Sequence, residues 1–278
     1  MAVITAPVAG NSILLAVMLA SRRKNGLHST MRPSAYLRQI ENRFVTTESP
    51  FVDMDWFDAC VDPAATMLAA DPRLPVYVGI DASTKHDSTA IVACTWDRTS
   101  NKARLVWHRI FQPSPDDPLD FEATVERTVL DLRTRFIIRK AIFDPWQMQS
   151  TGQRLRAQGV NIEEFPQSSP RLTEASQNLY ELIKSGNIVL YPDADIRLAV
   201  SRAVAKETSR GWRIGKEKQT HKIDVVVALG MAALVAAQQG SQAPAVPTFG
   251  VWGSTMEPNS SYIAQVWEES ARRIAAMK

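Results

Sequence analysis

The segment from Val76 to Asp97, which reads VYVGIDASTKHDSTAIVACTWD, constrains the fold of this chain most strongly. Its first residues are mainly β-branched or aromatic, which predicts a buried strand, and that strand ends on Asp81. A buried carboxylate must meet a metal ion, a cation or several hydrogen-bond donors, because an unpaired charge is not tolerated in a core. We therefore expect Asp81 either to bind a ligand or to cap the turn that follows the strand.

The residues after Asp81 indicate a hairpin and then a crossover. Residues 82–88 are polar and predict a turn, and Thr89 to Trp96 predict a second strand, so the two strands form a hairpin. A third strand is predicted from Arg104 to Phe111. Apolar residues recur at helical spacing from Leu119 to Phe136 and predict a crossover helix. The order of strands and helices predicts an α/β fold, with a central mixed sheet flanked by helices.

A second aspartate, Asp144, follows a short apolar strand predicted at Lys140 to Phe143. Pro145 comes next, and a helix is predicted from Trp146 to Gln158. Asp144 is therefore either a second ligand at a strand end or the N-cap of that helix. Farther along, the patterns predict a strand at 161–165, a helix at 174–185, an extended piece at 188–191 and a helix at 194–206.

A basic cluster lies between residues 202 and 222, where seven lysines and arginines face two acidic residues. The overall charge of +3 is only mildly basic, so this local cluster must carry any hypothesis of nucleic-acid binding. The cluster is either a solvated face or a loop that contacts DNA phosphates. Its members are Arg202, Lys206, Arg210, Arg213, Lys216, Lys218 and Lys222, with Trp212 among them.

The basic cluster leads into THKIDVVVALGMAALVAAQ, which is apolar nearly all round and predicts a buried helix from about His221 to Gln238. Asp224 falls in its first turn. It either complements the helix dipole or holds a divalent metal beside a phosphate. His221, three residues earlier, is expected on the same face as Asp224. It is either an auxiliary ligand or proton shuttle, or a surface histidine.

Three strand-end or helix-end aspartates suit phosphodiester hydrolysis. This reaction needs a nucleophilic water and a stabilised leaving oxygen, and two hard cations about 4 Å apart supply both. Because the candidate ligands are carboxylates, we expect two Mg²⁺ or Mn²⁺ ions. Cys60 and Cys94 lie outside any zinc-binding spacing and indicate no disulfide framework, which fits a reducing cytoplasm.

Two further classes of function are not indicated. No GxxxxGK[ST] motif occurs, so we expect no ATP hydrolysis by this chain. The apolar run from Ile13 to Ala20 is too short to span a bilayer. Its positive charges follow the run, whereas those of a signal peptide precede it, so we expect neither membrane insertion nor export.

Several stretches resemble one known family when they are taken together. They are VGIDAST and DSTAIV with Asp81 and Asp87, AIFDPWQ with Asp144, LTEASQNLYELIKSGNIVLYPDADIRLAV, and KEKQTHKIDVVVALGMA with Lys216, His221 and Asp224. In order and spacing, over about residues 35–238, they resemble the C-terminal nuclease domain of the large terminase subunit of tailed bacteriophages. The resemblance implies a ribonuclease H-like fold in which Asp81, Asp144 and Asp224 bind the metal ions, with Asp87 and His221 as auxiliary residues.

The resemblance also implies a function. The chain would be an endodeoxyribonuclease that cuts concatemeric double-stranded viral DNA during genome packaging, in the cytoplasm of the host of a phage or prophage. Its partners would be a portal protein, a small terminase subunit and a separate packaging ATPase. The alternatives are a non-cleaving DNA-binding or packaging-assembly module, and a resolvase-type or transposase-type nuclease with the same fold.

Four segments are expected along the chain. Residues 1–33 are linker-like, and residues 34–72 resemble the helical connector between packaging ATPase and nuclease. The nuclease domain is expected over residues 73–240, followed by a linker and tail helix in residues 241–278. Family members carry an N-terminal ATPase that has no counterpart in this sequence, so we expect a nuclease portion alone.

Overall fold

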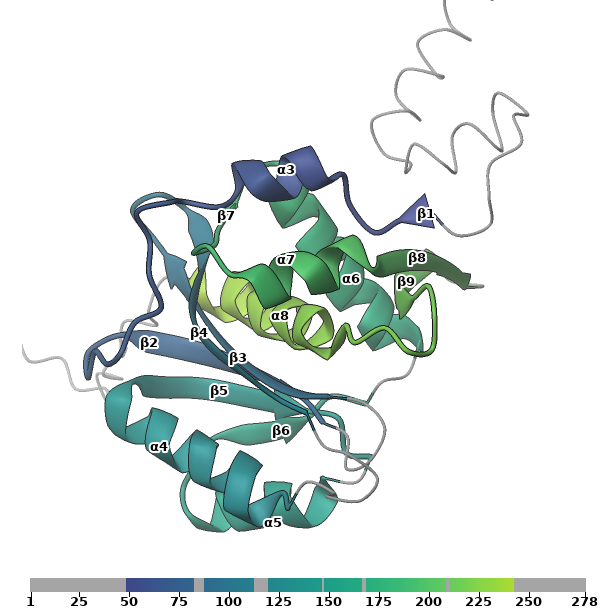
Figure 1. Ribbon diagram of the computed structural model, residues 1–278. Helices are drawn as coiled ribbons and strands as arrows, with labels where there is room; N and C mark the ends of the chain where they lie inside the picture. The colour runs from purple at the N-terminus through teal and green to yellow at the C-terminus, as the bar shows by residue number, and fades with distance from the viewer. Residues whose placement is uncertain are drawn as a thin grey trace, which may run out of the picture. The chain divides into compact units, whose positions relative to one another are not determined.

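Strand β2 (Pro75–Asp81) lies inside a six-stranded mixed sheet with the order β6-β5-β2-β3-β4-β7 (Figure 1). The structure is a computed structural model that describes residues 49–82, 88–112, 120–146, 148–166, 169–208 and 211–242. The other strands of the sheet are β3 (Thr89–Asp97), β4 (Lys102–Phe111), β5 (Ile137–Phe143), β6 (Ile162–Glu164) and β7 (Ile188–Val189).

The pairing of these strands confirms the hairpin and the third strand that were predicted at the start of the domain. Strand β2 pairs antiparallel with β3, and β3 pairs antiparallel with β4. On its other side, β2 pairs in parallel with β5, which is the strand reached through the crossover helix. The five central residues of β2 are buried, as expected for an apolar run covered on both faces.

Helices cover both faces of the sheet and divide its core into two clusters (Figure 1). On one face, Val129 and Leu132 of α4 (Arg127–Arg135) pack with Leu155 of α5 (Gln149–Ala157). On the other face, α6 (Ser169–Lys184) and α8 (Asp224–Val235) pack together. The π-helical turns η1 (Glu122–Glu126) and η2 (Ala236–Gly240) lie before α4 and after α8. This arrangement confirms the predicted α/β class.

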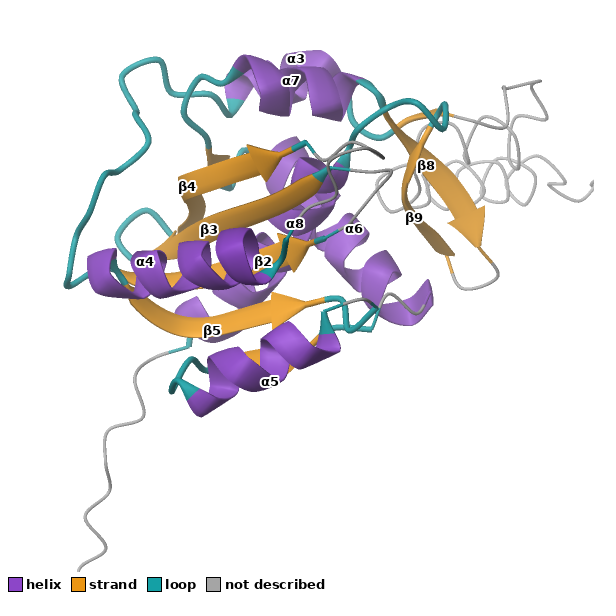
Figure 2. Cartoon of the chain, turned by 60° about the horizontal axis from the view of Figure 1, so that its bottom comes forward, coloured by secondary structure: helices purple, strands orange, loops and turns teal. Residues whose placement is uncertain are grey.

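A second, smaller sheet has the order β1-β8-β9 and lies to one side of the central sheet (Figure 2). It contains β1 (Ser49–Pro50), β8 (Ala203–Thr208) and β9 (Gly211–Lys216). The helix predicted at 194–206 is therefore too long, because α7 (Ala194–Ser201) ends before β8 begins. The basic cluster, predicted as a loop, is largely an antiparallel hairpin.

Other predicted boundaries also shift. Helix α5 begins at Gln149 rather than at Trp146, and α6 begins at Ser169, five residues before its predicted start at Glu174. Helix α8 begins at Asp224, so His221 lies outside it. The linker-like segment at 1–33, residues 34–48 of the predicted connector and residues 243–278 of the predicted tail at 241–278 lie outside the described residues.

The described part of the predicted connector packs into the domain. Phe51 and Phe57, the latter in α3 (Met54–Ala59), are almost completely buried. They belong to the same core cluster as Leu179 of α6 and Leu229 of α8. The second half of the connector is thus part of the hydrophobic core. Within the described residues, no helix has the length and apolar character needed to cross a membrane.

Candidate active site

Asp81 and Asp144 lie side by side at the carboxyl edge of the central sheet. In the parallel pair β2 and β5, Ile80 is in register with Phe143. Asp81 follows Ile80 as the last residue of β2, and Asp144 directly follows the end of β5. Neighbouring strands are about 4.8 Å apart, so the backbones of the two aspartates are close. Both residues are half-buried. Parallel pairing thus brings together two carboxylates that lie 63 positions apart in the sequence.

Asp144 caps a turn and not a helix. Its Oδ1 accepts a hydrogen bond of 3.2 Å from the backbone N–H of Trp146. The N-cap residue of α5 is Met148, and no side chain of the described residues caps that helix. The N-cap alternative for Asp144 is therefore wrong. The turn holds the Asp144 side chain at the sheet edge beside Asp81.

Asp224 is the first residue of α8 and is only 8% exposed. Ser88 immediately precedes β3, and its hydroxyl donates a hydrogen bond to Asp224 Oδ2. Because Asp81 pairs with Ala90, Ser88 lies just past Asp81 at the same end of the sheet. The helix N-terminus also stabilises the negative charge. This hydrogen bond links Asp224 to the edge that carries Asp81 and Asp144.

The direction of α8 also places Asp224 at this end. Gly79 of β2 lies against the backbone of Ala228, whereas Gly240, beyond the other end of α8, lies against Tyr77 and Trp96. Helix and strand therefore run in opposite directions. Moving two residues forward from Gly79 reaches Asp81, and moving one turn back from Ala228 reaches Asp224.

The donor set suits a hard divalent cation, although the described side chains do not complete a site alone. The three aspartates supply carboxylate oxygens, the donors preferred by Mg²⁺ and Mn²⁺. Among the described residues, no three His, Cys, Asp or Glu side chains form a group that would hold a metal ion. Asp87, the fourth predicted carboxylate, lies outside the described residues.

The sequence predicted that His221 shares a helical face with Asp224, but His221 lies outside the helix. It lies in the turn before α8, where its backbone N–H donates to Lys218 O at 3.0 Å. Its Nδ1 is buried and has no hydrogen-bond partner among the described residues, and it is 3.9 Å from Glu217 Oε2, too far for a hydrogen bond. The helix starts three residues later than predicted. An auxiliary role for His221 stays a prediction.

The hairpin β8–β9 carries much of the basic cluster. Lys206 and Arg213 are directly opposite each other in the ladder, and the Lys206 side chain lies across Gly215. Directly opposite residues of a ladder have Cβ atoms about 5 Å apart, so one phosphate can reach both cations.

The other basic residues lie around the hairpin. Lys216 ends β9, and Arg202 is the C-cap of α7. Lys218 and Lys222 follow in the turn before α8, and Arg210 is outside the described residues.

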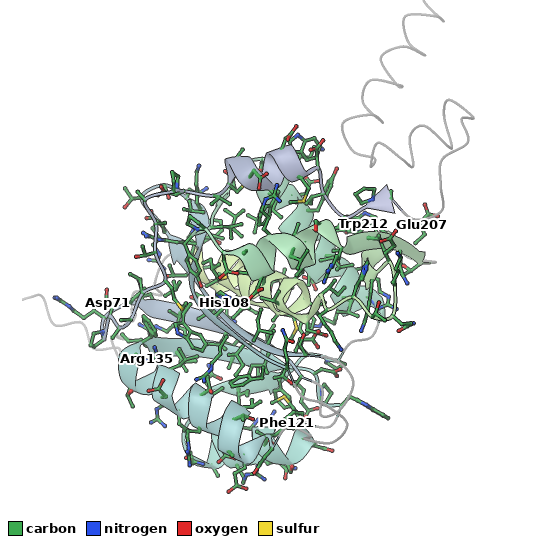
Figure 3. The ribbon with its side chains drawn as sticks, in the orientation of Figure 1. Asp71, His108, Phe121, Arg135, Glu207 and Trp212 are labelled. Atoms are coloured by element: carbon green, nitrogen blue, oxygen red, sulfur yellow. The ribbon has the colours of Figure 1, made fainter. Side chains whose placement is uncertain are left out.

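Trp212 is a structural residue of the hairpin. It pairs with Glu207 in the ladder, and Figure 3 shows the two residues together on this part of the molecule. Its ring lies 6.1 Å from that of Phe51 and 5.5 Å from that of Tyr180. Such aromatic contacts attach the hairpin to the core. Its presence among the cations is thus explained by packing.

Sequence reasoning missed two residues at the sheet edge. Ser88 was part of the predicted turn, and only its contact with Asp224 makes it notable. Trp146 was assigned to a helix, but it is 75% exposed in the turn after Asp144. The motifs DSTAIV and AIFDPWQ contain both residues, yet neither motif reveals where the side chain lies.

The chain is similar in sequence to a known phage protein. No family model matches it. It is 24% identical over 219 residues to the large terminase subunit of Enterobacteria phage HK97, an alignment that covers 69% of this chain and 42% of that protein. The chain thus matches less than half the length of this relative.

Solved structures agree with this similarity. The large terminase of bacteriophage HK97 matches with a TM-score of 0.57 and 18% identity, over 78% of this chain and 50% of that one. The large terminase nuclease of thermophilic phage G20c with bound magnesium matches with a TM-score of 0.54 and 18% identity, over 70% of this chain and 99% of that one. The chain is therefore similar in sequence to a phage large terminase subunit and has the ribonuclease H-like fold of large terminase nuclease domains.

Proposed function

We propose that this chain is a metal-dependent endonuclease that cuts concatemeric double-stranded DNA during phage genome packaging. One observation carries the proposal: Asp81 and Asp144 are neighbours at the carboxyl edge of parallel strands, and Ser88 links the buried Asp224 to the same edge. Three acidic residues gathered from two strands and a helix suit chemistry on phosphate more than they suit stability.

The proposed cofactors are two Mg²⁺ or Mn²⁺ ions held by Asp81, Asp144 and Asp224. Mg²⁺ usually keeps several waters and is held by one or two carboxylates together with substrate phosphates. The related G20c nuclease has been solved with bound magnesium. When bound, such ions supply a nucleophilic water and stabilise the leaving oxygen.

The protein itself contributes orientation. The Ser88 hydroxyl fixes one oxygen of Asp224, and the N-terminus of α8 favours its negative charge. The Trp146 N–H fixes one oxygen of Asp144. Carboxylates that are oriented before DNA binds need little rearrangement when the phosphate arrives.

DNA binding is assigned to the basic cluster. Lys206 and Arg213 can contact one phosphate together, and Lys216, Lys218 and Lys222 continue the positive charge from β9 toward Asp224 at the start of α8. Contacts of this kind read the phosphate backbone and carry little sequence information. We therefore propose an endonuclease of low sequence preference.

Packaging would require other proteins. Because its sequence contains no phosphate-binding loop, we propose that this chain does not hydrolyse ATP. We propose that it acts with a separate packaging ATPase. A portal protein and a small terminase subunit are further proposed partners, and the host cytoplasm is the proposed location. An ATPase rate that copurifies with the protein through further purification would contradict this part of the proposal.

One observation favours a second function, a DNA-binding or packaging-assembly module that does not cut. Among the described residues, no three His, Cys, Asp or Glu side chains form a group that would hold a metal ion. Incubating supercoiled plasmid with the protein and Mg²⁺ or Mn²⁺, beside an EDTA control, separates the two functions. The endonuclease proposal predicts open-circular and then linear DNA that EDTA prevents. Intact plasmid with both metals, together with salt-sensitive DNA binding, would favour the binding module.

A further inference from the structure

Trp146 is the most exposed large apolar side chain in the described part of the chain, at 75%. Leu198, Met67 and Ile137 follow at 46%, 44% and 37%. Tryptophan is highly buried on average, because its ring contributes much apolar area to a core. A ring left in water therefore suggests a binding partner.

The position of Trp146 is fixed relative to the proposed catalytic edge. Its backbone N–H donates to Asp144 Oδ1, and Pro145 restricts the backbone between them. Phe143 before the turn and Met148 after it are both fully buried. A short turn anchored at both ends thus places the backbone of Trp146 beside Asp144, with the indole exposed. Ile137, at the opposite end of the same strand β5, is far from them along the strand.

We propose that Trp146 stacks on an unpaired base of the nucleotide beside the scissile phosphate, an inference that rests on the nuclease proposal above. Two residues of extended chain span at most about 7 Å, so a ring two residues from Asp144 is within reach of a nucleotide whose phosphate is bound there. Aromatic rings bind the faces of bases with little sequence preference, whereas phosphates bind cations. An indole at this edge therefore suits a base.

The inference specifies the preferred form of the DNA. In an intact duplex both faces of each base are covered by neighbouring base pairs, so a ring can stack only where pairing is opened or a strand is single. DNA with a short gap beside the cleavage point should therefore bind more tightly than fully paired DNA. Trp146 should account for that difference, while the basic cluster contributes equally to both forms.

The test uses gapped and fully paired duplexes that carry one 2-aminopurine, a fluorescent base whose emission falls on stacking. Binding is measured with Ca²⁺, which accepts oxygen ligands with flexible geometry, and plasmid cleavage is measured separately with Mn²⁺. The wild-type protein should quench the unpaired base and prefer the gapped duplex. Trp146→Ala should lose the quenching and about tenfold of this preference, and Trp146→Phe should retain most of both. Ile137→Ala, which removes an exposed apolar group from the other end of β5, should behave as wild type.

The possible failures are distinguishable. If wild-type protein cuts plasmid and Trp146→Ala quenches the base as wild type does, stacking is wrong and the nuclease proposal stands. An equal loss of gap preference in Ile137→Ala would also overturn the assignment to Trp146. If wild-type protein cuts no plasmid with either metal, the nuclease proposal fails, and stacking beside a scissile phosphate fails with it.

Discussion

Gly79 of β2 and Ala228 of α8 are in direct backbone contact. A Cβ atom on Gly79 would lie 2.3 Å from Ala228 O and 2.8 Å from Ala232 N, distances that Cβ atoms essentially never adopt. Glycine at this position lets α8 lie directly on the sheet. The same contact sets the height of Asp224 above the edge that carries Asp81 and Asp144, so packing and the proposed chemistry depend on one residue.

Gly79→Ala should therefore impair both stability and cleavage. The added methyl group must push α8 off the sheet, and overpacking of this kind typically costs about 1–3 kcal/mol of unfolding free energy. Urea unfolding and plasmid cleavage measure the two effects. Gly230→Ala is the matched control, because its Cβ would meet Ala175 O at an ordinary 3.5 Å. This change within α8 should leave stability equal or raise it by about 0.5–1 kcal/mol. Wild-type behaviour of Gly79→Ala would contradict the proposed contact.

Ser88→Ala should weaken metal binding more than it weakens the fold. The variant removes the hydroxyl that donates to Asp224 Oδ2. Loss of a partner that orients a metal ligand typically costs about 10–100-fold in metal affinity or activity. Titrating cleavage against Mn²⁺ measures this shift, and Ser88→Thr, which keeps the hydroxyl, should recover most of it. Equal Mn²⁺ dependence of Ser88→Ala and wild type would show that this hydrogen bond does not orient a ligand.

His108 should make the domain less stable in mild acid. It is 8% exposed in β4, with Tyr191 Oη 2.6 Å from Nδ1 and Asp193 Oδ2 3.6 Å from Nε2 (Figure 3). Burial lowers the pKa of His108 below its usual 6.5, although the charges of Asp193 and Asp195 oppose this shift. The folded state then binds the proton less readily than the unfolded chain, so the free energy of unfolding falls as the pH drops below about 6.5.

The measurement is the melting temperature of wild type and His108→Gln between pH 7.5 and pH 5. Other groups titrate in both proteins, so the difference between the two curves isolates His108. The wild type should lose more stability on acidification than the variant does. Parallel curves would mean that burial does not disfavour the charged imidazole.

Replacing Lys206 and Arg213 together by alanine should weaken binding to all DNA sequences. The slope of log affinity against log salt should become shallower by about 2, because each lost phosphate contact changes it by about 0.9. Arg127→Ala removes an exposed cation from α4, on the opposite face of the central sheet, and should leave the slope unchanged. An unaltered slope in the double variant would remove the hairpin from the DNA interface.

The central strands were predictable from sequence, whereas the hairpin β8–β9 was not. Strands β2 to β4 are apolar, β-branched runs separated by polar turns, and such local patterns determine them. The start of β8 reads Ala203, Val204, Ala205 and continues the preceding helical pattern. Its pairing with β1 places Ala205 opposite Ser49, a contact between distant parts of the sequence. Nonlocal pairing outweighed local helix propensity there.

The sequence predicted individual residues of the candidate site but not the contacts between them. Strand ends indicated Asp81 and Asp144, and the parallel register that joins them follows from the crossover. The contact between Ser88 and Asp224 joins residues 136 positions apart, and no local pattern encodes it. The exposure of Trp146 was equally hidden, because aromatic residues usually anchor a core.

Plasmid cleavage by Asp81→Asn, Asp144→Asn and Asp224→Asn, each with Mn²⁺, tests the central claim most directly. Asparagine keeps the side-chain shape and removes the charge, so each variant should lose cleavage by orders of magnitude. Without metal, each should melt at or slightly above the wild-type temperature, because removing one of several like charges relieves repulsion. If Asp224 served only the helix dipole, its variant would lose about 0.3–1 kcal/mol of stability and still cut DNA. Full cleavage by any one variant would remove that residue from the metal site, and full cleavage by all three would contradict the proposed active site.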